Sequence, residues 1–507
     1  MPASSVDVAI VGGGSVGVSF LYQLIDALPR VQGCSIALFE PGSDIGPGTA
    51  YQADANSNLL NIPVNRMSAI AQQPDSFLDW LRQRDAGFLA RMGITEIDPG
   101  SFVSRPVFGL YMQDLYDQAA TLAAARGIEL RCYRQRVVRV QPRPEGGATV
   151  QGADGLQIKA ARVVLCNGNL PSVTFAQLSD SPRYFNSPYP VAGMTRTVGE
   201  TDDVCIVGTS LSAIDAIVAL HAAGHRGAIH CVSRNGRLPA VRSPHNRGVR
   251  LPRLPEVEPD GRVTLDGLVG SLRRALKEAG GVEDPHDILG SGASAADALD
   301  EEIARSQAGP RLWQSVAAAT NERIEHIWHA LDEAERLRFH RDWRTLWMAR
   351  RATFPMRNAL TLQTLLRAGR LRVHGGFQGV TESGDGMGFE VGTDTDVLRA
   401  PWLINATSFS LDVGATSDPL VRDLCRAGHA RAHPLGGFDL DFDTGCLIDA
   451  SGRRVDAISV LGSLAAGTYF WTTSMEINAR LALGQALQVA EQVIVGGQSG
   501  LSRARMA

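Results

Sequence analysis

The sequence lacks paired cysteines, a strong charge excess and any long hydrophobic run. Its seven cysteines stand singly, with no Cys-x-x-Cys pair, which argues against a zinc ribbon, a redox-active dithiol and a disulfide reductase. A dispersed, odd set of cysteines is typical of a reducing cytosol, so we expect a cytoplasmic protein. The formal net charge is −4, which gives no electrostatic reason to expect nucleic acid or an anionic membrane as a partner.

Three further patterns are missing. No apolar run is long enough to span a bilayer, and we expect no signal peptide ahead of the first apolar run. The sequence shows no catalytic triad, paired-carboxylate signature or metal-ligand cluster, so we expect no metal. The 507 residues, 44% hydrophobic and 20% charged, are ordinary globular material for two or three domains.

A glycine-rich loop near the start of the chain predicts a dinucleotide site. It reads Val11-Gly12-Gly13-Gly14-Ser15-Val16-Gly17 after a short apolar run that suits a buried parallel strand. Gly12 permits the tight turn, Gly14 lets a pyrophosphate approach the backbone, and Gly17 lets the next helix lie close to the strand. We expect that helix over residues 18–28, with its N-terminus stabilising the phosphates.

An acid follows at the expected place. A second strand over 35–39 ends at Glu40, whose carboxylate can accept hydrogen bonds from both ribose hydroxyls. The same charge repels a 2′-phosphate, so the first nucleotide is predicted to be FAD or NAD rather than NADP. A glycine-rich turn without a ligand would not need strand, loop, helix, strand and acid in this order.

A second, less regular loop occurs at 206–213. Ser210 stands where the middle glycine is expected and Ala213 where the third is. We expect the strand at 204–207 before it and a helix over 211–223 after it. The next strand, 228–232, ends in Ser233 and Arg234, a hydroxyl and a guanidinium that suit a 2′-phosphate. This favours NADPH over NADH; the alternative is that Arg234 is a solvated surface arginine.

These patterns predict an α/β protein with two Rossmann-like dinucleotide-binding domains, for FAD and NADPH, and a mostly helical insertion. Residues 1–170 would form the first part of the FAD domain, and 396–507 its C-terminal part. Residues 171–395 would form the NADPH domain, with the insertion at about 236–355. The stretch 171–200 reads as a linker.

Smaller elements complete the expected FAD domain. A short antiparallel meander is predicted, with segments at 136–140, 148–150 and 156–158, and it ends in an apolar strand over 161–166 that runs into Asn167 and Gly168. Near the C-terminus we expect a strand at 458–462, a loop over 467–476 and an amphipathic helix over 477–495.

Four segments carry a resemblance to a known family: Gly46-Pro47-Gly48-Thr49-Ala50-Tyr51, Leu59-Leu60-Asn61-Ile62-Pro63, Phe77-Leu78-Asp79-Trp80-Leu81 and Arg105-Pro106-Val107-Phe108-Gly109-Leu110-Tyr111. With both glycine loops, the chain resembles two-dinucleotide flavoproteins, including flavin-containing and N-hydroxylating monooxygenases. It is most similar to a bacterial family described as FAD/NAD(P)-binding proteins. It departs from related monooxygenases at Ser210 and at Asn405-Ala406-Thr407-Ser408, where those usually end in "ATG".

The resemblance implies an FAD- and NADPH-dependent monooxygenase that uses dioxygen and a flavin C4a-(hydro)peroxide to hydroxylate a small, polar metabolite. N-hydroxylation of an amine or amino acid is the first choice and C-hydroxylation the second. A flavin dehydrogenase or reductase without oxygen insertion is an alternative, and a non-catalytic redox sensor or scaffold is another. Because the cofactors supply the chemistry, no catalytic triad or metal is required.

The candidate site residues follow from these motifs. For FAD they are Gly12, Gly13, Gly14, Ser15, Val16, Gly17, Glu40, Gly48, Thr49, Tyr51, Asn61, Asn167, Gly168, Gly462, Thr472 and Thr473. For NADPH they are Gly208, Ser210, Ser212, Ser233 and Arg234. Asn61 and Asn65 offer amides near the flavin edge or the nicotinamide, although either could be an ordinary loop asparagine. The backbone near Thr472 and Thr473 could bind the flavin pyrimidine, and the following helix N-terminus could stabilise negative charge on reduced flavin.

The remaining candidates have competing interpretations. Arg66 could face an anionic substrate or form a structural ion pair. The arginine-rich stretch 341–357 could be a lid that binds a carboxylate, or a solvated helical face above Trp343 and Trp347. His245 and His433 are lone histidines for which a structural role is favoured over acid–base catalysis.

Overall fold

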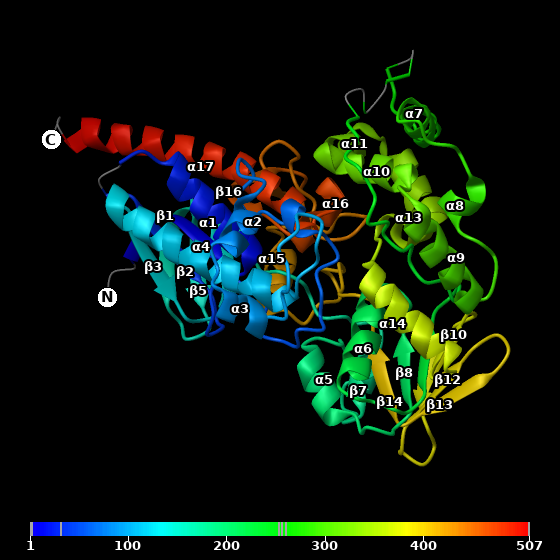
Figure 1. Cartoon of the computed structure of the whole chain (residues 1–507). Helices are drawn as coiled ribbons and strands as arrows, with labels where there is room; N and C mark the ends of the chain where they lie inside the picture. Colours follow the sequence, from blue (N-terminus) through cyan, green and yellow to red (C-terminus); the bar gives the residue numbers. More distant parts are fainter. Residues whose placement is uncertain (1–3, 31–32, 252–253, 255–256, 259–260, 505–507) are drawn as a thin grey trace. The chain divides into compact units, whose positions relative to one another are not determined.

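The computed structural model describes residues 4–30, 33–251, 254, 257–258 and 261–504. The chain divides into two compact units (Figure 1). Unit 1 comprises Met1–Ala53, Ile62–Leu170 and Ser410–Ala507, and unit 2 comprises Asp54–Asn61 and Pro171–Phe409. The chain therefore passes from one unit to the other four times.

The core of unit 1 is a sheet in the order β15-β16-β6-β1-β2-β3, with β4 and β5 added as an antiparallel extension of β6. The strands β16, β6, β1, β2 and β3 pair in parallel. Their bounds are β1 Ser4–Val11, β2 Ser35–Phe39, β3 Glu129–Tyr133, β4 Val137–Pro142, β5 Ala148–Gly152, β6 Gln157–Leu165, β15 Cys446–Ile448 and β16 Arg454–Val460. The parallel arrangement with crossover helices confirms the predicted α/β class.

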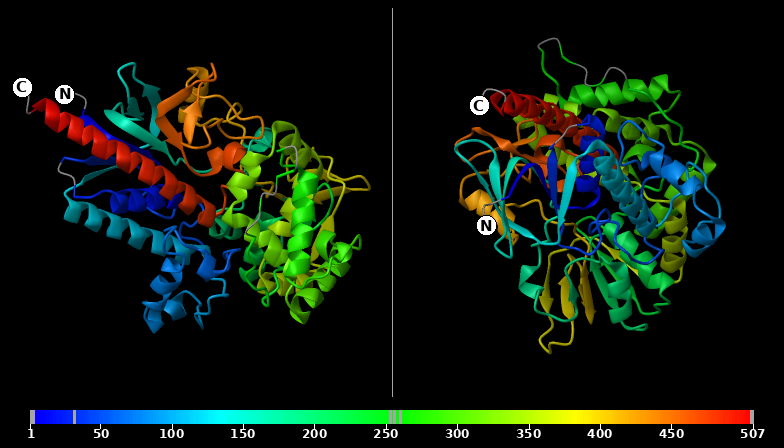
Figure 2. Two further views of the ribbon diagram at one scale, coloured as in Figure 1. Left: turned by 90° about the horizontal axis from the view of Figure 1, so that it is seen from above. Right: turned by 90° about the vertical axis from the view of Figure 1, so that its left-hand side faces the viewer.

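Helix α1 (Ser15–Ala27) packs against both α4 (Arg105–Arg126) and α17 (Met475–Ala504), and Figure 2 shows these helices side by side. The apolar side chains of Phe20, Leu21, Leu24 and Ile25 in α1 are fully buried. In the same helix, Gln23 donates from Nε2 to the carbonyl of Ala479 at 3.1 Å. The other helices of unit 1 are η1 Val64–Arg66, α2 Ser76–Arg82, α3 Ala86–Arg91, α15 Pro419–Arg426, η5 Ser463–Ala465 and α16 Ala466–Tyr469.

Two predictions for unit 1 were wrong in detail. The strands expected to end at 158 and to restart at 161 are one strand, β6. The loop expected over 467–476 contains most of the one-turn helix α16, and α17 already begins at Met475.

Unit 2 is built on a parallel sheet in the order β10-β9-β8-β14-β7. Helices α5 and α14 both pack against α6. A separate antiparallel sheet has the order β11-β12-β13. The bounds are β7 Tyr184–Phe185, α5 Val191–Thr197, β8 Val204–Val207, α6 Leu211–Ala222, β9 Ile229–Val232, α14 Met356–Arg367, β10 Leu371–His374, β11 Gly379–Glu382, β12 Phe389–Gly392, β13 Val397–Ala400 and β14 Trp402–Asn405, with η2 at Ala176–Leu178. The stretch 171–200 is thus no plain linker, because it supplies both β7 and α5.

The helices expected between β9 and β10 are present. They are α7 Leu265–Glu278, α8 Pro285–Leu289, α9 Ala295–Ala308, α10 Leu312–Ala319, η3 Thr320–Glu322, α11 Ile324–Ala330, α12 Glu333–Arg338, η4 Phe339–Trp343 and α13 Arg344–Arg351. A buried ion cluster joins α9, α13 and the residue before α10: the carboxylate of Glu302 accepts from Arg311 and, at 2.7 Å, from Arg350. Both guanidinium groups lie 5.1 Å from the Trp313 ring.

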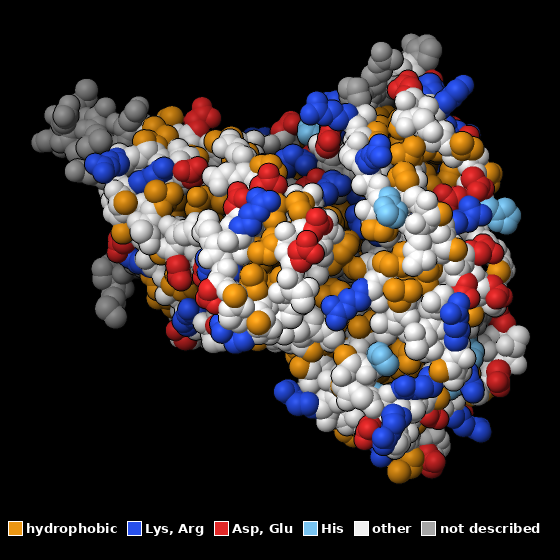
Figure 3. All heavy atoms as spheres, in the orientation of Figure 1, with side chains coloured by type: hydrophobic (Ala, Val, Ile, Leu, Met, Phe, Trp, Pro, Cys, Tyr) orange, Lys and Arg blue, Asp and Glu red, His pale blue; other side chains and the backbone are white. Residues whose placement is uncertain are grey.

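The surface shown in Figure 3 carries acidic and basic side chains interspersed over each unit, in keeping with the small net charge. Among the described residues, no helix has the length and apolar composition that a membrane crossing requires.

Candidate dinucleotide sites

The first glycine loop follows the carboxyl end of β1 and runs close to two neighbouring strands. Gly12 has φ +105°, and a Cβ there would lie 2.3 Å from the carbonyl oxygen of Cys166, just after β6. Its N–H donates to the carbonyl of Phe39, at the end of β2, at 2.9 Å. A Cβ on Gly17 would lie 2.0 Å from the carbonyl oxygen of Gly12. Side chains are therefore sterically excluded from both positions.

The second loop repeats these backbone relations in unit 2. Gly208 has φ +120°, and a Cβ there would lie 2.6 Å from the carbonyl oxygen of Ala406. Its N–H donates to Val232, at the end of β9, at 2.7 Å. The N–H of Ala406 donates to Val207 at 2.8 Å, just as the N–H after β6 donates to the end of β1 at 2.7 Å. The two loops are equivalent backbone structures at the carboxyl ends of two parallel sheets.

Ser210, which stands where the motif usually has its middle glycine, is compatible with this backbone geometry. Gly14 precedes α1 with φ −73° and ψ −172°, and Ser210 precedes α6 with φ −93° and ψ −163°. Both are extended conformations that any residue adopts, so serine brings no backbone strain. Ser212 occupies the second position of α6 and is half-buried.

Glu40 touches the first loop directly. Its Oε2 accepts the N–H of Gly13 at 2.8 Å, and its Oε1 accepts the N–H of Gly42 at 2.8 Å. A Cβ on Gly13 would lie 2.8 Å from the Cβ of Glu40, so the second glycine of the loop makes room for the acid. Each carboxylate oxygen keeps acceptor capacity for a ribose hydroxyl.

Segment 46–51, one of the four that carry the family resemblance, packs against this loop and against segment 105–111. The N–H of Gly46 donates to Gly13 at 2.7 Å, and a Cβ on Gly48 would lie 3.1 Å from Cα of Gly14. In α4, a Cβ on Gly109 would lie 2.1 Å from the carbonyl oxygen of Tyr51. The ring of Tyr51 also packs edge-on against Phe108, at 4.7 Å between centroids, while Thr49 is exposed. These glycines allow the 46–51 turn to pack against both the loop and α4.

The strand ends of β6 and β16 supply further candidates. Gly168 and Gly462 have φ +77° and +88°, and a Cβ on Gly462 would lie 3.7 Å from the Val16 side chain. Asn167 has a buried Oδ1 with no partner among the described residues. The predicted residues at these two strand ends therefore lie beside the first loop.

Several buried polar atoms cluster at the start of α17. The hydroxyls of Thr472 and Ser474, residues that are 1% and 3% exposed, have no hydrogen-bond partner in the described part of the chain. Thr473 between them is exposed. Arg66 pairs with Glu476 in the first turn of α17 at 3.1 Å, so its structural interpretation is the correct one. The adjacent Asn65 has a buried Oδ1 without a described partner.

Unpaired buried polar atoms are destabilising unless a ligand or water satisfies them. The atoms in unit 1, together with the loop and Glu40, form a set that fits a flavin dinucleotide: backbone amides for the pyrophosphate, an acid for the ribose, and polar groups at a helix N-terminus for the flavin ring. Asn61 belongs to unit 2; its assignment to the flavin stays a prediction.

The end of β9 carries the predicted 2′-phosphate group. Ser233 Oγ accepts the N–H of Gly236 at 3.0 Å and lies 3.0 Å from Oγ1 of the buried Thr209. Arg234 is exposed. Partial burial and the charge of Arg234 lower the pKa of Arg344, at the start of α13. Neither guanidinium has an acidic partner in the described part of the chain, so an anion beside both would be stabilised.

Asn405 explains the turn that follows β14. The residue is 2% exposed. Its Oδ1 accepts the N–H of Thr407 at 3.0 Å, and its Nδ2 donates to Ser172 Oγ at 3.1 Å. The asparagine thus shapes the turn behind Gly208, a role that local sequence did not reveal.

The arginine-rich stretch is largely structural. Arg350 pairs with Glu302, Arg351 donates to Asn321 at 2.6 Å, and Arg341 pairs with its neighbour Asp342 at 2.7 Å. The His433 ring has a local role, because its Nδ1 accepts the N–H of Leu435 at 3.0 Å. The backbone N–H of His245 donates to Ser243 Oγ at 3.1 Å, and the role of its ring stays a prediction. The described residues contain no group of three or more His, Cys, Asp or Glu that could hold a metal ion.

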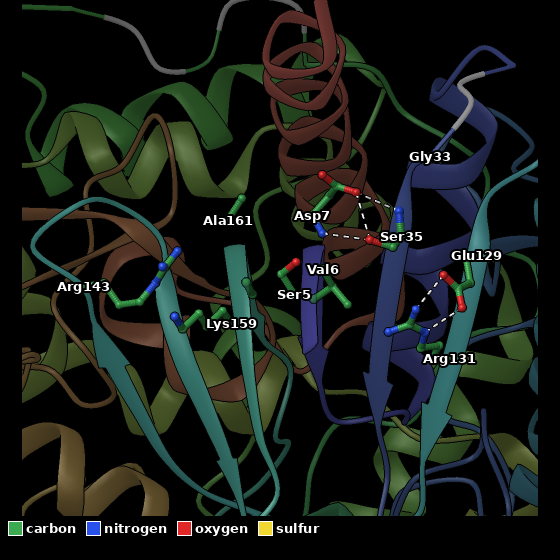
Figure 4. A pocket seen from close by; sticks show the side chains of 11 residues that line it. Ser5, Val6, Asp7, Gly33, Ser35, Glu129, Arg131, Arg143, Lys159 and Ala161 are labelled. Carbon is green, nitrogen blue, oxygen red and sulfur yellow. Dashed lines mark hydrogen bonds and ion pairs between the residues drawn. The ribbon is translucent and has the colours of Figure 1, made fainter. Parts of the chain in front are cut away.

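A polar pocket of about 510 Å³ lies at the amino ends of the unit 1 strands (Figure 4). Its side chains include Asp7, which accepts from Ser35 at 2.8 and 3.0 Å, and Arg131, which pairs with Glu129 at 2.7 Å. Because the glycine loop follows the opposite, carboxyl end of β1, this pocket is not the nucleotide site.

Comparison with known proteins agrees with this geometry. Residues 9–170 match a family model described as FAD-NAD(P)-binding. The uncharacterized protein YdhS of Escherichia coli (strain K12) is 27% identical over 230 residues, which are 42% of this chain. The match spans 39% of the length of that relative.

Two solved structures share the fold over nearly the whole chain. L-lysine 6-monooxygenase from Pseudomonas syringae is 16% identical, with a TM-score of 0.58 over 96% of this chain and 99% of that one. An ornithine N-hydroxylase from Kutzneria sp. 744, solved with reduced FAD, NADP⁺ and L-ornithine, is 15% identical, with a TM-score of 0.53 over 96% and 99%. The family match confirms the predicted resemblance to FAD/NAD(P)-binding proteins over residues 9–170, and the chain has the fold of these two flavin-dependent oxidoreductases.

Proposed function

We propose that this protein is a cytoplasmic FAD- and NADPH-dependent monooxygenase that N-hydroxylates a small, polar amine or amino acid. The observation that carries the proposal is the pair of equivalent glycine loops, one with an acid at its second strand and the other with arginine. The acid suits an unphosphorylated ribose, and the arginine suits a 2′-phosphate. One chain that binds both nucleotides has the parts needed to reduce a flavin with NADPH.

Unit 1 would bind FAD and unit 2 NADPH, so that residues 396–409, which the sequence assigned to the FAD domain, would belong with β14 to the NADPH domain. The first loop and Glu40 would hold the adenosine and pyrophosphate of FAD, and Thr472, Ser474 and the α17 N-terminus would hold the flavin ring. Bound FAD would supply hydride acceptance and oxygen activation. The chain's own residues would orient the ring and stabilise its negative charge when reduced.

The choice of an amine substrate is supported by the solved neighbours, whose names specify lysine and ornithine. Those chains are at most 16% identical to this one, so the substrate must be found by experiment. Dioxygen would be the second substrate, and Arg234 and Arg344 of unit 2 would contact cofactor phosphate.

The first experiment is the absorption spectrum of the purified protein, followed by anaerobic addition of NADPH. We expect a bound flavin that bleaches with NADPH and much less with NADH. Aerobic incubation with a panel of amines and amino acids should then give a hydroxylamine from at least one of them, coupled to NADPH oxidation.

Three outcomes would contradict parts of the proposal. Absence of retained or added flavin would refute the enzyme and favour a nucleotide-binding scaffold. Bleaching followed by formation of hydrogen peroxide alone, with every amine, would favour a dehydrogenase or reductase. A carbon-hydroxylated product would retain the monooxygenase and exclude N-hydroxylation.

A further inference from the structure

Segment 54–61 crosses from the first part of the chain into unit 2, although its sequence neighbours on both sides belong to unit 1. Asp54 connects this segment to unit 2 by two hydrogen bonds. Its Oδ2 accepts the N–H of Val191 at 3.0 Å, and its Oδ1 accepts the N–H of Ala192 at 2.8 Å, at the start of α5. The carboxylate therefore satisfies two amide donors that begin a helix and have no partner within it.

Asp54 also orients Asn58. The amide Nδ2 of Asn58 donates to Oδ2 of Asp54 at 3.2 Å, and the N–H of Asn58 donates to Ala55 at 3.0 Å. Only the nitrogen of an amide can donate to a carboxylate. The orientation of the Asn58 amide is therefore fixed, and its oxygen is left for another partner.

That oxygen is buried without one. Asn58 is 2% exposed, and its Oδ1 has no hydrogen-bond donor in the described part of the chain. The hydroxyl of the neighbouring Ser57 is also buried without a hydrogen-bond partner among the described residues. A buried acceptor of this kind needs a donor from outside the protein, and an uncharged N–H is sufficient.

The segment is connected through α5 to α6, the helix that follows the second glycine loop. Ala55 packs against the same core cluster as Leu211, the first residue of α6. Tyr189, just before α5, donates to Asp215 in the second turn of α6 at 2.5 Å. Helices α5 and α6 also pack together. The buried amide is thus on the part of unit 2 that surrounds the N-terminus of α6.

We propose that Asn58 Oδ1 accepts a hydrogen bond from the carboxamide N–H of the nicotinamide ring, and that Asp54 is the positioning residue that aims it. The inference rests on the proposed function, because it requires NADP(H) to bind unit 2. The adenine amino group is the other N–H donor of the nucleotide. It belongs with the 2′-phosphate end, which the Ser233–Arg234 strand end is expected to bind.

The test uses a nucleotide that lacks only this donor. In 3-acetylpyridine adenine dinucleotide phosphate, a methyl group replaces the carboxamide NH₂. Titration calorimetry with the flavin-loaded protein would give the dissociation constants of the analogue and of NADP⁺. Because an unsatisfied buried acceptor costs about 1–3 kcal/mol, the wild type should bind the analogue roughly 5- to 150-fold more weakly.

Two substitutions, Asn58→Ala and Asn58→Leu, remove the acceptor, and both should reduce that ratio to about 2 or less. Asp54→Ala should reduce it too, because the amide is no longer oriented. Asn56→Ala, on the exposed side of the same segment, is the matched control and should keep the wild-type ratio. Retained flavin and an unchanged far-ultraviolet circular dichroism spectrum identify the variants that have folded.

The outcomes separate the two proposals. If the wild type discriminates between the nucleotides and a folded Asn58 variant does so equally, the role of Asn58 is refuted and NADP(H) binding stands. A wild type that binds both nucleotides equally also refutes it. If the wild type binds neither nucleotide, the NADPH part of the proposed function fails, and this inference fails with it.

Discussion

Replacing Arg234 with alanine tests the nucleotide assignment of unit 2 most directly. Hydrogen bonds to charged groups contribute about 1.5–3 kcal/mol. Arg234 is exposed, where solvent screening weakens the interaction, so the lower value applies. A loss of about 1.5 kcal/mol corresponds to a rise of roughly tenfold in the KM for NADPH. The KM for NADH, which has no 2′-phosphate, should not change.

Arg344 provides a second test of the NADPH assignment of unit 2. Burial and repulsion by Arg234 lower its pKa, and an anion beside both residues would relieve that repulsion. Arg344→Ala should therefore raise the KM for NADPH by about 3- to 10-fold. Because the double variant lacks both charges, its KM for NADPH should also depend less on ionic strength than that of the wild type.

Steady-state flavin reduction at several NADPH and NADH concentrations measures these effects. Arg226→Ala is the control, because Arg226 is an exposed arginine of unit 2 paired with Glu200 at 3.3 Å. Equal increases of KM for NADPH and NADH in Arg234→Ala would refute the 2′-phosphate assignment. Additive, independent effects of Arg234 and Arg344 would refute a shared anion.

The remaining predictions concern the glycine loops and the insertion. Gly17→Ala places a Cβ 2.0 Å from a backbone oxygen and should abolish flavin retention, measured as the ratio of visible to ultraviolet absorbance, whereas Gly484→Ala faces open space and should not. Asn405→Ala leaves buried groups unpaired and should destabilise unit 2 by about 1–3 kcal/mol; it should weaken NADPH binding while FAD stays bound. Glu302→Gln breaks the buried cluster with the two arginines and should cost about 3–5 kcal/mol, seen as a lower melting temperature. The folded environment lowers the pKa of Glu302. The stability that Glu302 provides is therefore fully present above the ordinary glutamate pKa of about 4.3 and is lost as the pH falls through the pKa of the folded state. A Glu302→Gln variant that loses as much stability in acid as the wild type would contradict this role.

The nucleotide folds could be predicted because their signals are local. The strand, glycine loop and helix around Gly12 and Gly208 depend on residues within one βαβ unit, and the structure shows the same backbone contacts at both loops. The contact of Glu40 with the N–H of Gly13 and the packing of Gly109 on Tyr51 depend on residues brought together only by folding. Sequence motifs identified these residues, but not what they touch.

The errors have physical causes. Strand β6 alternates between buried and exposed residues where it pairs with β5, and is then buried continuously, so its pattern changes within one strand and resembles two. Strand β7 is only two residues long and exists because it pairs with β14, far along the sequence. Segment 54–61 carries no local sign that it belongs to unit 2, since Asp54 is recruited by the N-terminus of α5.

The pairing of β16 with β6 has a consequence for biosynthesis. Strand β6 lies at the centre of the unit 1 sheet, yet its parallel partner Arg454–Val460 and the helix that packs on α1 are translated only after the whole of unit 2. A ribosome delivers residues in order, and domains generally fold as units. Unit 2 has all its chain by Phe409 and can fold during synthesis, while unit 1 lacks β16 and α17 until the residues after Phe409 have been made. Removing α17 should therefore harm flavin incorporation before it harms the folding of unit 2.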